Sequence, residues 1–381
     1  MFDACLTMRL IIIGIKDVFA DSTELQYASS RLLSSLPASA TRVFANVDDW
    51  AALEKFAVVQ VDAAGLMDGD HVLLLAHAAL MPAPGTLAAL AAALDAGAGA
   101  ALAFDSRHPC PALGPDYFTV RGIERYAASL AKCMVFPYGE NPFPPSVLML
   151  SAGQLRRGDW RASVVCVPGA YAHDFSSYHQ GRREEVISLV PVAASCVLDV
   201  GGGEGGFLEA LKAARACETH LAEFSETACL AASSRVDRVW PGDFMRSEFD
   251  KKFDCITFLD VLEHTEWPAQ WLVRARQLLR TDGCVIASIP NVGHWSVVAD
   301  LLEGRWDYAP AGIHCITHLR FFTKVGVEQL MAEAGYEIVT IEATRSEIPE
   351  WFNLPEIGGR LVVDREALAT YSFLILARPY Q

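Results

Sequence analysis

Two stretches of this chain alternate short apolar runs with segments of helical spacing. In residues 8–110, strands are predicted at "RLIIIGI", "TRVFANV", "HVLLLAH" and "AGAALAF", and helices at "LQYASSRLLSSL" and "TLAALAAALDA". This alternation is typical of an α/β layer with a largely parallel sheet. From Arg107 to about Gly169 prolines recur and interrupt the pattern, leaving one predicted helix, "GIERYAASLAKCM", and a closing strand, "SVLML".

A second alternation runs from about residue 171 to the C-terminus. Strands are predicted at "SCVLDV", "THLAEF", "DCITFLD" and "CVIASIP", with a final antiparallel pair at "YEIVTIEAT" and "SFLILARP". Helices are predicted at "REEVISLV", "GFLEALKAA", "PAQWLVRARQLL" and "VGVEQLMAEAG". We therefore expect two α/β domains, residues 8–168 and 171–381, with the boundary near "CVPGAYAHD".

Composition supports two folded domains and narrows the partners. The chain has 381 residues, of which 52% are hydrophobic and 20% charged, as expected of a globular, core-forming protein. The net charge of -15 repels phosphate backbones, so no nucleic-acid partner is expected.

Cysteine usage and hydropathy indicate a cytoplasmic protein. The ten cysteines are scattered between Cys5 and Cys315 without a C-x-x-C pair, which favours buried thiols in a reducing compartment over disulfides or zinc. The longest apolar runs are too short to cross a bilayer. No charged segment with a cleavage site precedes them, so no signal peptide is predicted. No metal site is predicted either.

The strongest local signal is the segment "VLDVGGGEGGF", in which an apolar strand reaches Asp199 and a glycine turn leads into a helix. Glycines let the backbone approach a ligand closely, and a helix N-terminus offers free amide groups to an anion. The spacing fits G-x-G-x-G at Gly201, Gly203 and Gly205, and it also fits the dinucleotide pattern G-x-G-x-x-G. A tight turn without a ligand is the alternative.

Acidic residues after the next strands point to an adenosine-bearing ligand. Glu223 follows the strand "THLAE" at the distance where an acid binds ribose hydroxyls in dinucleotide folds. It fits a nicotinamide cofactor and S-adenosylmethionine equally well. In "PGDF", Asp243 can accept from an adenine amino group while Phe244 packs on the base.

The segments that follow resemble class I S-adenosylmethionine-dependent methyltransferases. The resemblance rests on "FDCITFLDVLEH", "LLRTDGCVIASIPN", "SIPNVGHWSVVADLLEGRWDYAPAGI" and "THLRFFT", and it extends from Tyr171 to the C-terminus. They are similar to a bacterial group often found with, or fused to, sugar-transfer enzymes of surface-polysaccharide synthesis. The resemblance implies a Rossmann-like sheet of seven strands, the last pair antiparallel, with S-adenosylmethionine as cofactor. Nothing downstream resembles a hydride-transfer site, which disfavours a dehydrogenase.

The resemblance also implies which residues hold the cofactor. The glycine turn and Asp199 would surround its methionine part, and Asp260 would line the site at the end of the fourth strand. "AYAHDFSSYHQGRREE" resembles the helix that covers the cofactor. The full implied set is Asp199, Gly201, Gly203, Gly205, Glu223, Asp243, Phe244, Asp260, Tyr178 and Arg182.

Three histidines are candidates for catalysis. Methyl transfer is an in-line displacement that needs alignment and, for a hydroxyl acceptor, removal of a proton. Histidine suits that removal because its ordinary pKa is near 6.5. His264 either acts on the acceptor or orients its loop, and His294 lies on the loop side where open α/β sheets bind ligands. His318 either acts catalytically or has a structural role before the predicted N-cap Thr323.

The acceptor side departs from the pattern of the similar proteins. Where they usually read G-I-L-D-R-T-H, this chain reads "GIHCITH", so Cys315 and Ile316 replace an acid and a base. A different acceptor is expected, with His314 taking over part of the lost role. The aromatic residues Trp295, Trp306 and Tyr308 form either a wall for a sugar ring or the core of a lid.

We expect O-methylation of a sugar or a related secondary metabolite, with a small-molecule or glycan acceptor. N-methylation is the alternative enzymatic activity, because an amine needs little more than alignment. A non-catalytic S-adenosylmethionine-binding scaffold is the alternative outside them.

The N-terminal half resembles the middle of a GT-A glycosyltransferase, in the segment "DGDHVLLLAHAALMPAPGTLAALAAALDAGAGAALAF". In that family the strand ends in D-x-D, whose carboxylates hold a divalent metal, an ion that prefers oxygen ligands. Ala76, His77 and Ala78 stand there instead. The resemblance therefore implies a truncated, degenerate domain that packs, forms a homodimer or helps to recognise the acceptor.

Overall fold

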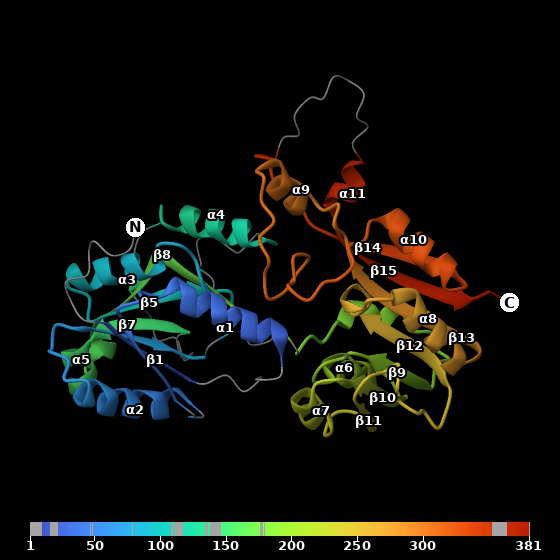
Figure 1. Ribbon diagram of the computed structural model, residues 1–381, viewed down its shortest axis with the longest axis horizontal. Coiled ribbons are helices and arrows are strands. Elements are labelled where there is room, and N and C mark those ends of the chain that lie inside the picture. Colours follow the sequence, from blue (N-terminus) through green and yellow to red (C-terminus); the bar gives the residue numbers. More distant parts are fainter. Residues whose placement is uncertain are drawn as a thin grey trace, which may run out of the picture. The chain divides into compact units, whose positions relative to one another are not determined.

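The computed structural model describes residues 10–15, 22–45, 47, 49–77, 79–107, 110, 117–133, 136–137, 146–175, 178, 180–352 and 364–380. The chain divides into two compact units, Met1–Ser176 and Ser177–Gln381 (Figure 1). The stretch expected to contain the domain boundary, "CVPGAYAHD", is part of strand β8 (Val164–Asp174). The strand tolerates Pro168 and Gly169 because its register against β5 (Ala100–Asp105) shifts at that point, as β-bulges allow.

The N-terminal unit is built on one mixed sheet. The order of its main strands is β2-β1-β3-β7-β5-β8-β4, and the short β6 also pairs with β8. The pairs β1–β2, β1–β3 and β5–β8 are parallel, whereas β7 runs antiparallel to both of its neighbours. Its remaining elements are β1 (Leu10–Ile15), α1 (Thr23–Ser35), β2 (Thr41–Ala45), α2 (Trp50–Ala63), β3 (His71–Leu75), β4 (Leu80–Pro82), α3 (Thr86–Asp95), α4 (Val120–Leu130), β6 (Phe136–Pro137), β7 (Val147–Ser151), α5 (Ala152–Arg157) and a 3₁₀ helix at Trp160–Ser163.

Helices cover both faces of this sheet. Alternate strand residues point to opposite faces: Leu73 packs in one cluster with α1 and α3, and Leu74 in another with α2 and α5. The sequence pattern did not predict α2, which Asp49 caps by accepting from the Ala52 amide at 2.7 Å.

The C-terminal unit contains a seven-stranded sheet in the order β11-β10-β9-β12-β13-β15-β14. The first five strands are parallel, and β15 runs antiparallel to both β13 and β14, which confirms the expected final antiparallel pair. Its strands are β9 (Cys196–Val200), β10 (Glu218–Glu223), β11 (Arg238–Pro241), β12 (Phe253–Leu259), β13 (Leu279–Pro290), β14 (Tyr336–Arg345) and β15 (Thr370–Pro379). Its helices are α6 (Gly206–Ala214), α7 (Glu226–Ala232), α8 (Pro268–Leu278), α9 (Trp295–Leu302), α10 (Lys324–Glu333) and α11 (Arg365–Ala369), with 3₁₀ turns at Glu184–Leu189 and Leu262–His264.

This sheet also has helices on both faces. Leu198 belongs to a core cluster with α8 and α10, and its neighbour Val197 to a second cluster with α6. The strand order reverses between β9 and β12, because the chain proceeds outward from β9 to β11 and then returns to the other side of β9. Open α/β sheets bind ligands beyond the carboxyl ends of the strands at such a switch point.

Two expected α-helices are absent from the described residues between β8 and β9. The segment "AYAHDFSSYHQGRREE" belongs first to β8 and then, over residues 180–183, has no regular structure. The residues predicted as the helix "REEVISLV" form only the 3₁₀ turn Glu184–Leu189.

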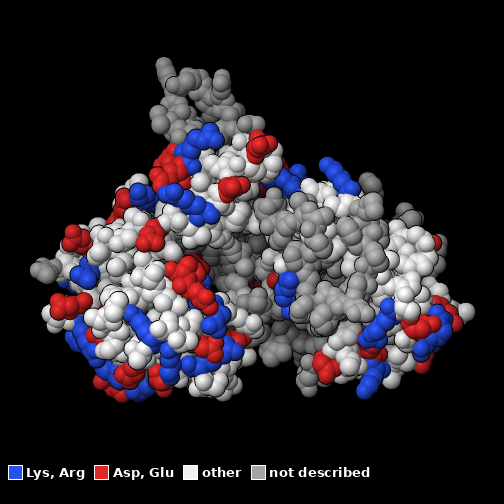
Figure 2. Space-filling view, turned by 180° about the vertical axis from the view of Figure 1, so that it is seen from behind, with Lys and Arg blue, Asp and Glu red and all other residues white. Residues whose placement is uncertain are grey.

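Charges are mixed on the surface. On the face shown in Figure 2, the described Lys and Arg side chains alternate with Asp and Glu side chains, and they form no continuous basic surface. Within the described part of the chain, no helix has both the length and the apolar character needed to cross a bilayer.

Candidate functional site

The glycine turn after β9 surrounds a buried carboxylate. Asp199 is 1% exposed, and its Oδ1 accepts from Thr257 Oγ1 on β12 at 2.5 Å, across the switch point. Its Oδ2 is buried without a hydrogen-bond partner among the described residues. A Cβ on Gly202 would lie 2.1 Å from that oxygen, so this conformation of the turn requires glycine at position 202. Burial raises the pKa of Asp199 to about 7.

Glu223 ends β10, the next strand outward, and it is 8% exposed. Its Oε2 accepts from the Gly203 amide at 2.9 Å, and its Oε1 accepts from the Ser225 amide at 2.8 Å. The carboxylate therefore joins the glycine turn to the start of α7, and each oxygen keeps a further lone pair for a ligand hydroxyl.

Asp243 follows β11 and is one-third exposed. Its Oδ1 accepts from the Met245 amide at 2.9 Å.

The neighbouring Phe244 is placed differently from our expectation. Its ring is 2% exposed and packs against Phe258 and Trp271 at centroid distances of 5.7 and 5.5 Å. The ring is therefore part of the hydrophobic core, and the predicted packing on an adenine base is wrong for this conformation.

Asp260 lies just after β12, in the left-handed conformation with φ +57°. Its Oδ1 accepts from Ser288 Oγ on β13 at 2.7 Å, and its Oδ2 forms an ion pair with Arg183. Arg183 was not among the predicted residues, because nothing local shows that it contacts a residue 77 positions later.

The segment before the 3₁₀ turn covers the start of α6. A Cβ on Gly206 would lie 2.8 Å from the carbonyl oxygen of Gly181. The predicted contact Arg182 instead pairs with Glu184 and Glu209 at 2.9 and 3.0 Å and is half exposed. Tyr178 is half-buried. The described part of this segment therefore lies against the start of α6 as irregular structure and not as the expected helix.

A second group of polar side chains follows β12. Glu263 is fully buried, and neither carboxylate oxygen has a hydrogen-bond partner among the described residues. Burial raises its pKa well above the usual value. His318 Nε2 lies 3.9 Å from Glu263 Oε1, and the rings of His264 and His318 are 4.6 Å apart. We call Glu263, His264 and His318 the acceptor-side cluster.

Hydrogen bonds fix the orientation of both histidines. His264 Nδ1 pairs with Thr317 Oγ1 at 2.9 Å, and His318 Nδ1 donates to the carbonyl oxygen of Ile313 at 2.9 Å. The loop that departs from the similar proteins thus supplies Thr317 and His318 to the residues after β12. Two of the three predicted histidines therefore lie together, and no local pattern indicates that Glu263 joins them.

These elements match a known family. Residues 177–341 match the family model described as a methyltransferase domain, and the match includes the glycine turn, the acidic strand ends and the acceptor-side cluster. The C-terminal unit contains a methyltransferase domain. Enzymes of this class take the methyl group from S-adenosylmethionine, which is therefore its cofactor. No curated protein matches the chain.

Solved structures of methyltransferases are similar to this unit at low identity. The CcbJ methyltransferase from Streptomyces caelestis is 15% identical over 52% of this chain and 89% of its own, with a TM-score of 0.37. Magnesium protoporphyrin IX methyltransferase from Synechocystis PCC 6803 is 15% identical over 53% and 80%, with a TM-score of 0.35. Mitomycin 7-O-methyltransferase is 15% identical over 54% of this chain and 55% of its own, with a TM-score of 0.38. Such distant similarity says nothing about the acceptor.

The third predicted catalytic histidine of the methyltransferase unit has a structural role. His294 is fully buried and caps α9, where its Nδ1 accepts from the Ser296 amide. Its Nε2 pairs with Ser346 Oγ at 2.7 Å, and burial lowers the pKa of His294 to about 4. Both ring nitrogens are thus engaged within the protein, which is the physical reason why the predicted role as a base is wrong.

Replacing His294 by alanine should therefore reduce stability more than turnover. The variant loses a helix cap and a buried hydrogen bond, together about 2–4 kcal/mol, measurable by denaturant unfolding of the purified protein. His264→Ala is the matched control, since His264 is less buried and should affect turnover. Unchanged stability with lost turnover in His294→Ala would restore the catalytic role.

Burial also decides the role of other predicted acceptor-side residues. His314 is fully buried and packs against Trp306, with the ring centroids 4.3 Å apart and the ring planes tilted by 38°. Trp295 is 5% exposed and packs on Trp351. These rings pack within the protein, whereas Tyr308 is 42% exposed.

In the N-terminal unit, a carboxylate from another strand lies beside His77, which stands in place of the D-x-D motif. Asp174, from β8, lies 3.0 Å from His77 and 2.5 Å from Arg107. It stands 97 residues after His77, so no local pattern could reveal it. Because the Arg107 guanidinium already neutralises it, the carboxylate is poorly suited to a metal. Ala78 lies outside the described residues.

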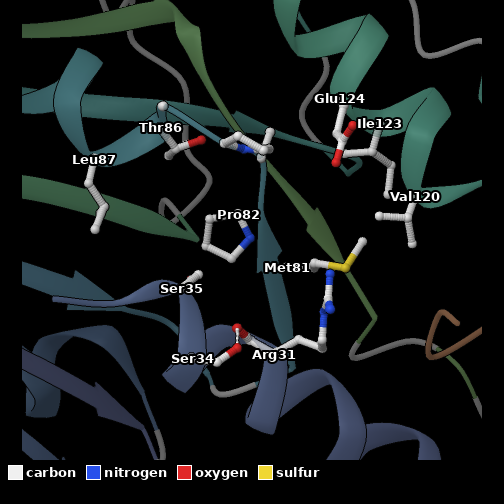
Figure 3. A pocket seen from close by; sticks show the side chains of 13 residues that line it. Arg31, Ser34, Ser35, Met81, Pro82, Thr86, Leu87, Val120, Ile123 and Glu124 are labelled. Atoms are coloured by element: carbon white, nitrogen blue, oxygen red, sulfur yellow. Dashed lines mark hydrogen bonds between the residues drawn. The ribbon is translucent and has the colours of Figure 1, made fainter. Parts of the chain in front are cut away.

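A pocket opens in the N-terminal unit between α1, α4 and the turn from β4 to α3 (Figure 3). Arg31 and Glu124 supply its charged groups. Its apolar wall consists of Met81, Pro82, Leu87, Val120 and Ile123. A small ligand with both apolar and polar groups fits such a lining.

Proposed function

We propose that this methyltransferase methylates an oxygen of a small-molecule or glycan acceptor, a sugar or a related secondary metabolite. The observation that carries the proposal is the acceptor-side cluster, in which two histidines and a carboxylate lie close together just beyond the carboxyl end of β12. An amine acceptor needs little beyond alignment, whereas a hydroxyl must lose a proton.

The proposed cofactor site follows the order of the strands. Asp199, Glu223 and Asp243 stand at the carboxyl ends of β9, β10 and β11, which are adjacent in the sheet. Methionine, ribose and adenine follow one another in the same order along S-adenosylmethionine. Asp199 would therefore pair with the methionine ammonium, Glu223 would accept from the ribose hydroxyls, and Asp243 would accept from the adenine amino group.

The remaining members of the predicted set belong to the same proposal with adjusted roles. Gly201, Gly203 and Gly205, all at positive φ, let the backbone approach the methionine part. Asp260 would face the methyl group from β12, and Arg183, rather than Arg182, would cover it.

The acceptor would lie on the β12 side of the cofactor, next to the acceptor-side cluster. The acceptor oxygen attacks the methyl carbon, the carbon–sulfur bond breaks, and its electron pair goes to sulfur. The products are S-adenosylhomocysteine, the methyl ether and the hydroxyl proton. The acceptor-side cluster would promote loss of that proton, and His264, half-buried, is its most accessible member.

For the N-terminal unit we propose a degenerate GT-A-like domain that recognises the acceptor or forms a homodimer. The neutralised Asp174 and the pocket of Figure 3 support recognition over sugar transfer. We also propose a cytoplasmic location, supported by the observation that none of the nine described cysteines forms a disulfide.

The test is incubation of the purified chain with S-adenosylmethionine labelled in the methyl group and panels of hydroxyl and amine acceptors. We expect label in a base-stable methyl ether of a hydroxyl acceptor. Transfer only to amines would support N-methylation. Cofactor binding without transfer to either panel would support a scaffold.

A further inference from the structure

Among the described residues, Glu263 has no hydrogen-bond partner for its carboxylate. Both carboxylate oxygens are buried without a hydrogen bond among the described residues, and the nearest cationic candidate is His318, 3.9 Å away. A buried carboxylate needs compensation by a proton, an ion pair or a metal. An oxygen of Glu263 and one ring nitrogen each of His264 and His318 lie within 4.8 Å of one another.

The two imidazoles are oriented as metal ligands usually are. A ligating histidine typically makes an outer hydrogen bond with one ring nitrogen, often to a backbone carbonyl, and presents the other to the metal. His318 donates from Nδ1 to Ile313 O, which directs Nε2 toward Glu263. His264 is held through Nδ1 by Thr317. Both outer hydrogen-bond partners, Thr317 and Ile313, belong to the loop where this chain departs from the similar proteins.

We infer that Glu263, His264 and His318 bind a divalent transition-metal ion, which in turn binds the acceptor oxygen. This inference rests on the proposed function, because it specifies how the acceptor-side cluster promotes loss of the hydroxyl proton. Two imidazoles and one carboxylate suit Mn²⁺, Fe²⁺, Co²⁺ or Zn²⁺ better than Mg²⁺ or Ca²⁺. Three protein ligands leave a coordination position open, as in catalytic metal sites.

A bound hydroxyl loses its proton more readily because the cation stabilises the alkoxide. The balance of methyl transfer is unchanged: the proton passes to solvent, the alkoxide oxygen forms the bond to the methyl carbon, and the sulfur keeps the electron pair. An acceptor with two neighbouring oxygens, such as a vicinal diol, would chelate the ion and fix which oxygen is methylated.

A second group, Cys196, Glu218 and His220, has comparable spacing and provides the internal comparison. It stands at the amino ends of β9 and β10, at the opposite edge of the sheet from the cofactor residues. Its carboxylate is already neutralised, since Glu218 accepts from Lys251 at 2.6 Å. The second group therefore lacks the uncompensated charge that Glu263 presents.

The first test measures metal binding by the full chain. Metal-free protein is dialysed against Mn²⁺, Zn²⁺ or Mg²⁺ and analysed by elemental mass spectrometry, with S-adenosylhomocysteine titrated into the same samples. We expect one Mn²⁺ or Zn²⁺ per chain and weaker Mg²⁺ binding. In Glu263→Gln, affinity should fall at least on the order of 10- to 100-fold, the effect of losing even an outer-shell partner. In the control Glu218→Gln it should not change.

The second test uses the wild-type protein, so it does not depend on a variant that folds. Co²⁺ bound by imidazole and carboxylate should show weak visible bands without a thiolate charge-transfer band. A strong thiolate band would place the ion at Cys196 and overturn the inference, as would absence of bound metal or binding that survives in Glu263→Gln. Retained binding of S-adenosylhomocysteine in those cases leaves the methyltransferase proposal standing, whereas its loss in the wild type contradicts the proposed cofactor site instead.

Discussion

Replacing Glu223 by alanine should weaken the binding of S-adenosylhomocysteine by roughly 10²- to 10⁴-fold. The proposed ribose contact consists of two hydrogen bonds to a carboxylate, each worth about 1.5–3 kcal/mol, and every 1.4 kcal/mol changes affinity about tenfold. The variant also releases the Gly203 and Ser225 amides that Glu223 holds, so the turn that faces the cofactor loses its fixed shape. Isothermal titration calorimetry measures the affinity directly.

The same strand supplies a matched control. Glu218 begins β10 and Glu223 ends it, so Glu218→Ala removes the same side chain from the opposite edge of the sheet. That variant should bind the cofactor product like the wild type. Equal affinity in Glu223→Ala and the wild type, with both proteins folded by circular dichroism, would contradict the proposed ribose site.

Residues at strand ends could be predicted from the sequence because their position depends on local pattern alone. The apolar run before Asp199 and the run before Glu223 fix where β9 and β10 end, and parallel strands bring such ends to one edge. Phe244 shows the limit of this reasoning: its place after a strand was read correctly, but whether its ring faces a ligand or the core depends on residues such as Trp271.

The local sequence pattern could not predict which distant residues contact one another or how deeply a side chain is buried. Arg183 and Asp260 lie 77 positions apart, and His264 and Thr317 lie 53 apart, so only the folded chain pairs them. His294 was expected to face the substrate because it follows a strand, yet its neighbours bury it completely. The covering helix was expected from the resemblance, but there β8 takes up the first part of the segment.

Cofactor affinity should depend on pH through Asp199, whose pKa burial raises to about 7. Between its ordinary value of 3.8 and 7, the native protein holds a proton that the unfolded chain has released. The free energy of unfolding therefore decreases by about 4 kcal/mol as pH rises through that window. The methionine ammonium needs the ionised carboxylate, so the affinity for S-adenosylhomocysteine should rise about tenfold per pH unit from 5 to 7.

Titrations between pH 5 and 7 check this dependence. In Asp199→Asn the affinity should be low and nearly independent of pH, because no carboxylate is left to ionise. In Asp243→Asn, which removes a more exposed carboxylate of the same site, the affinity should be lower but the slope unchanged. A flat profile in the wild type would mean that Asp199 does not bind the ammonium. A buried carboxylic acid must first lose its proton before the resulting carboxylate can pair with a cation.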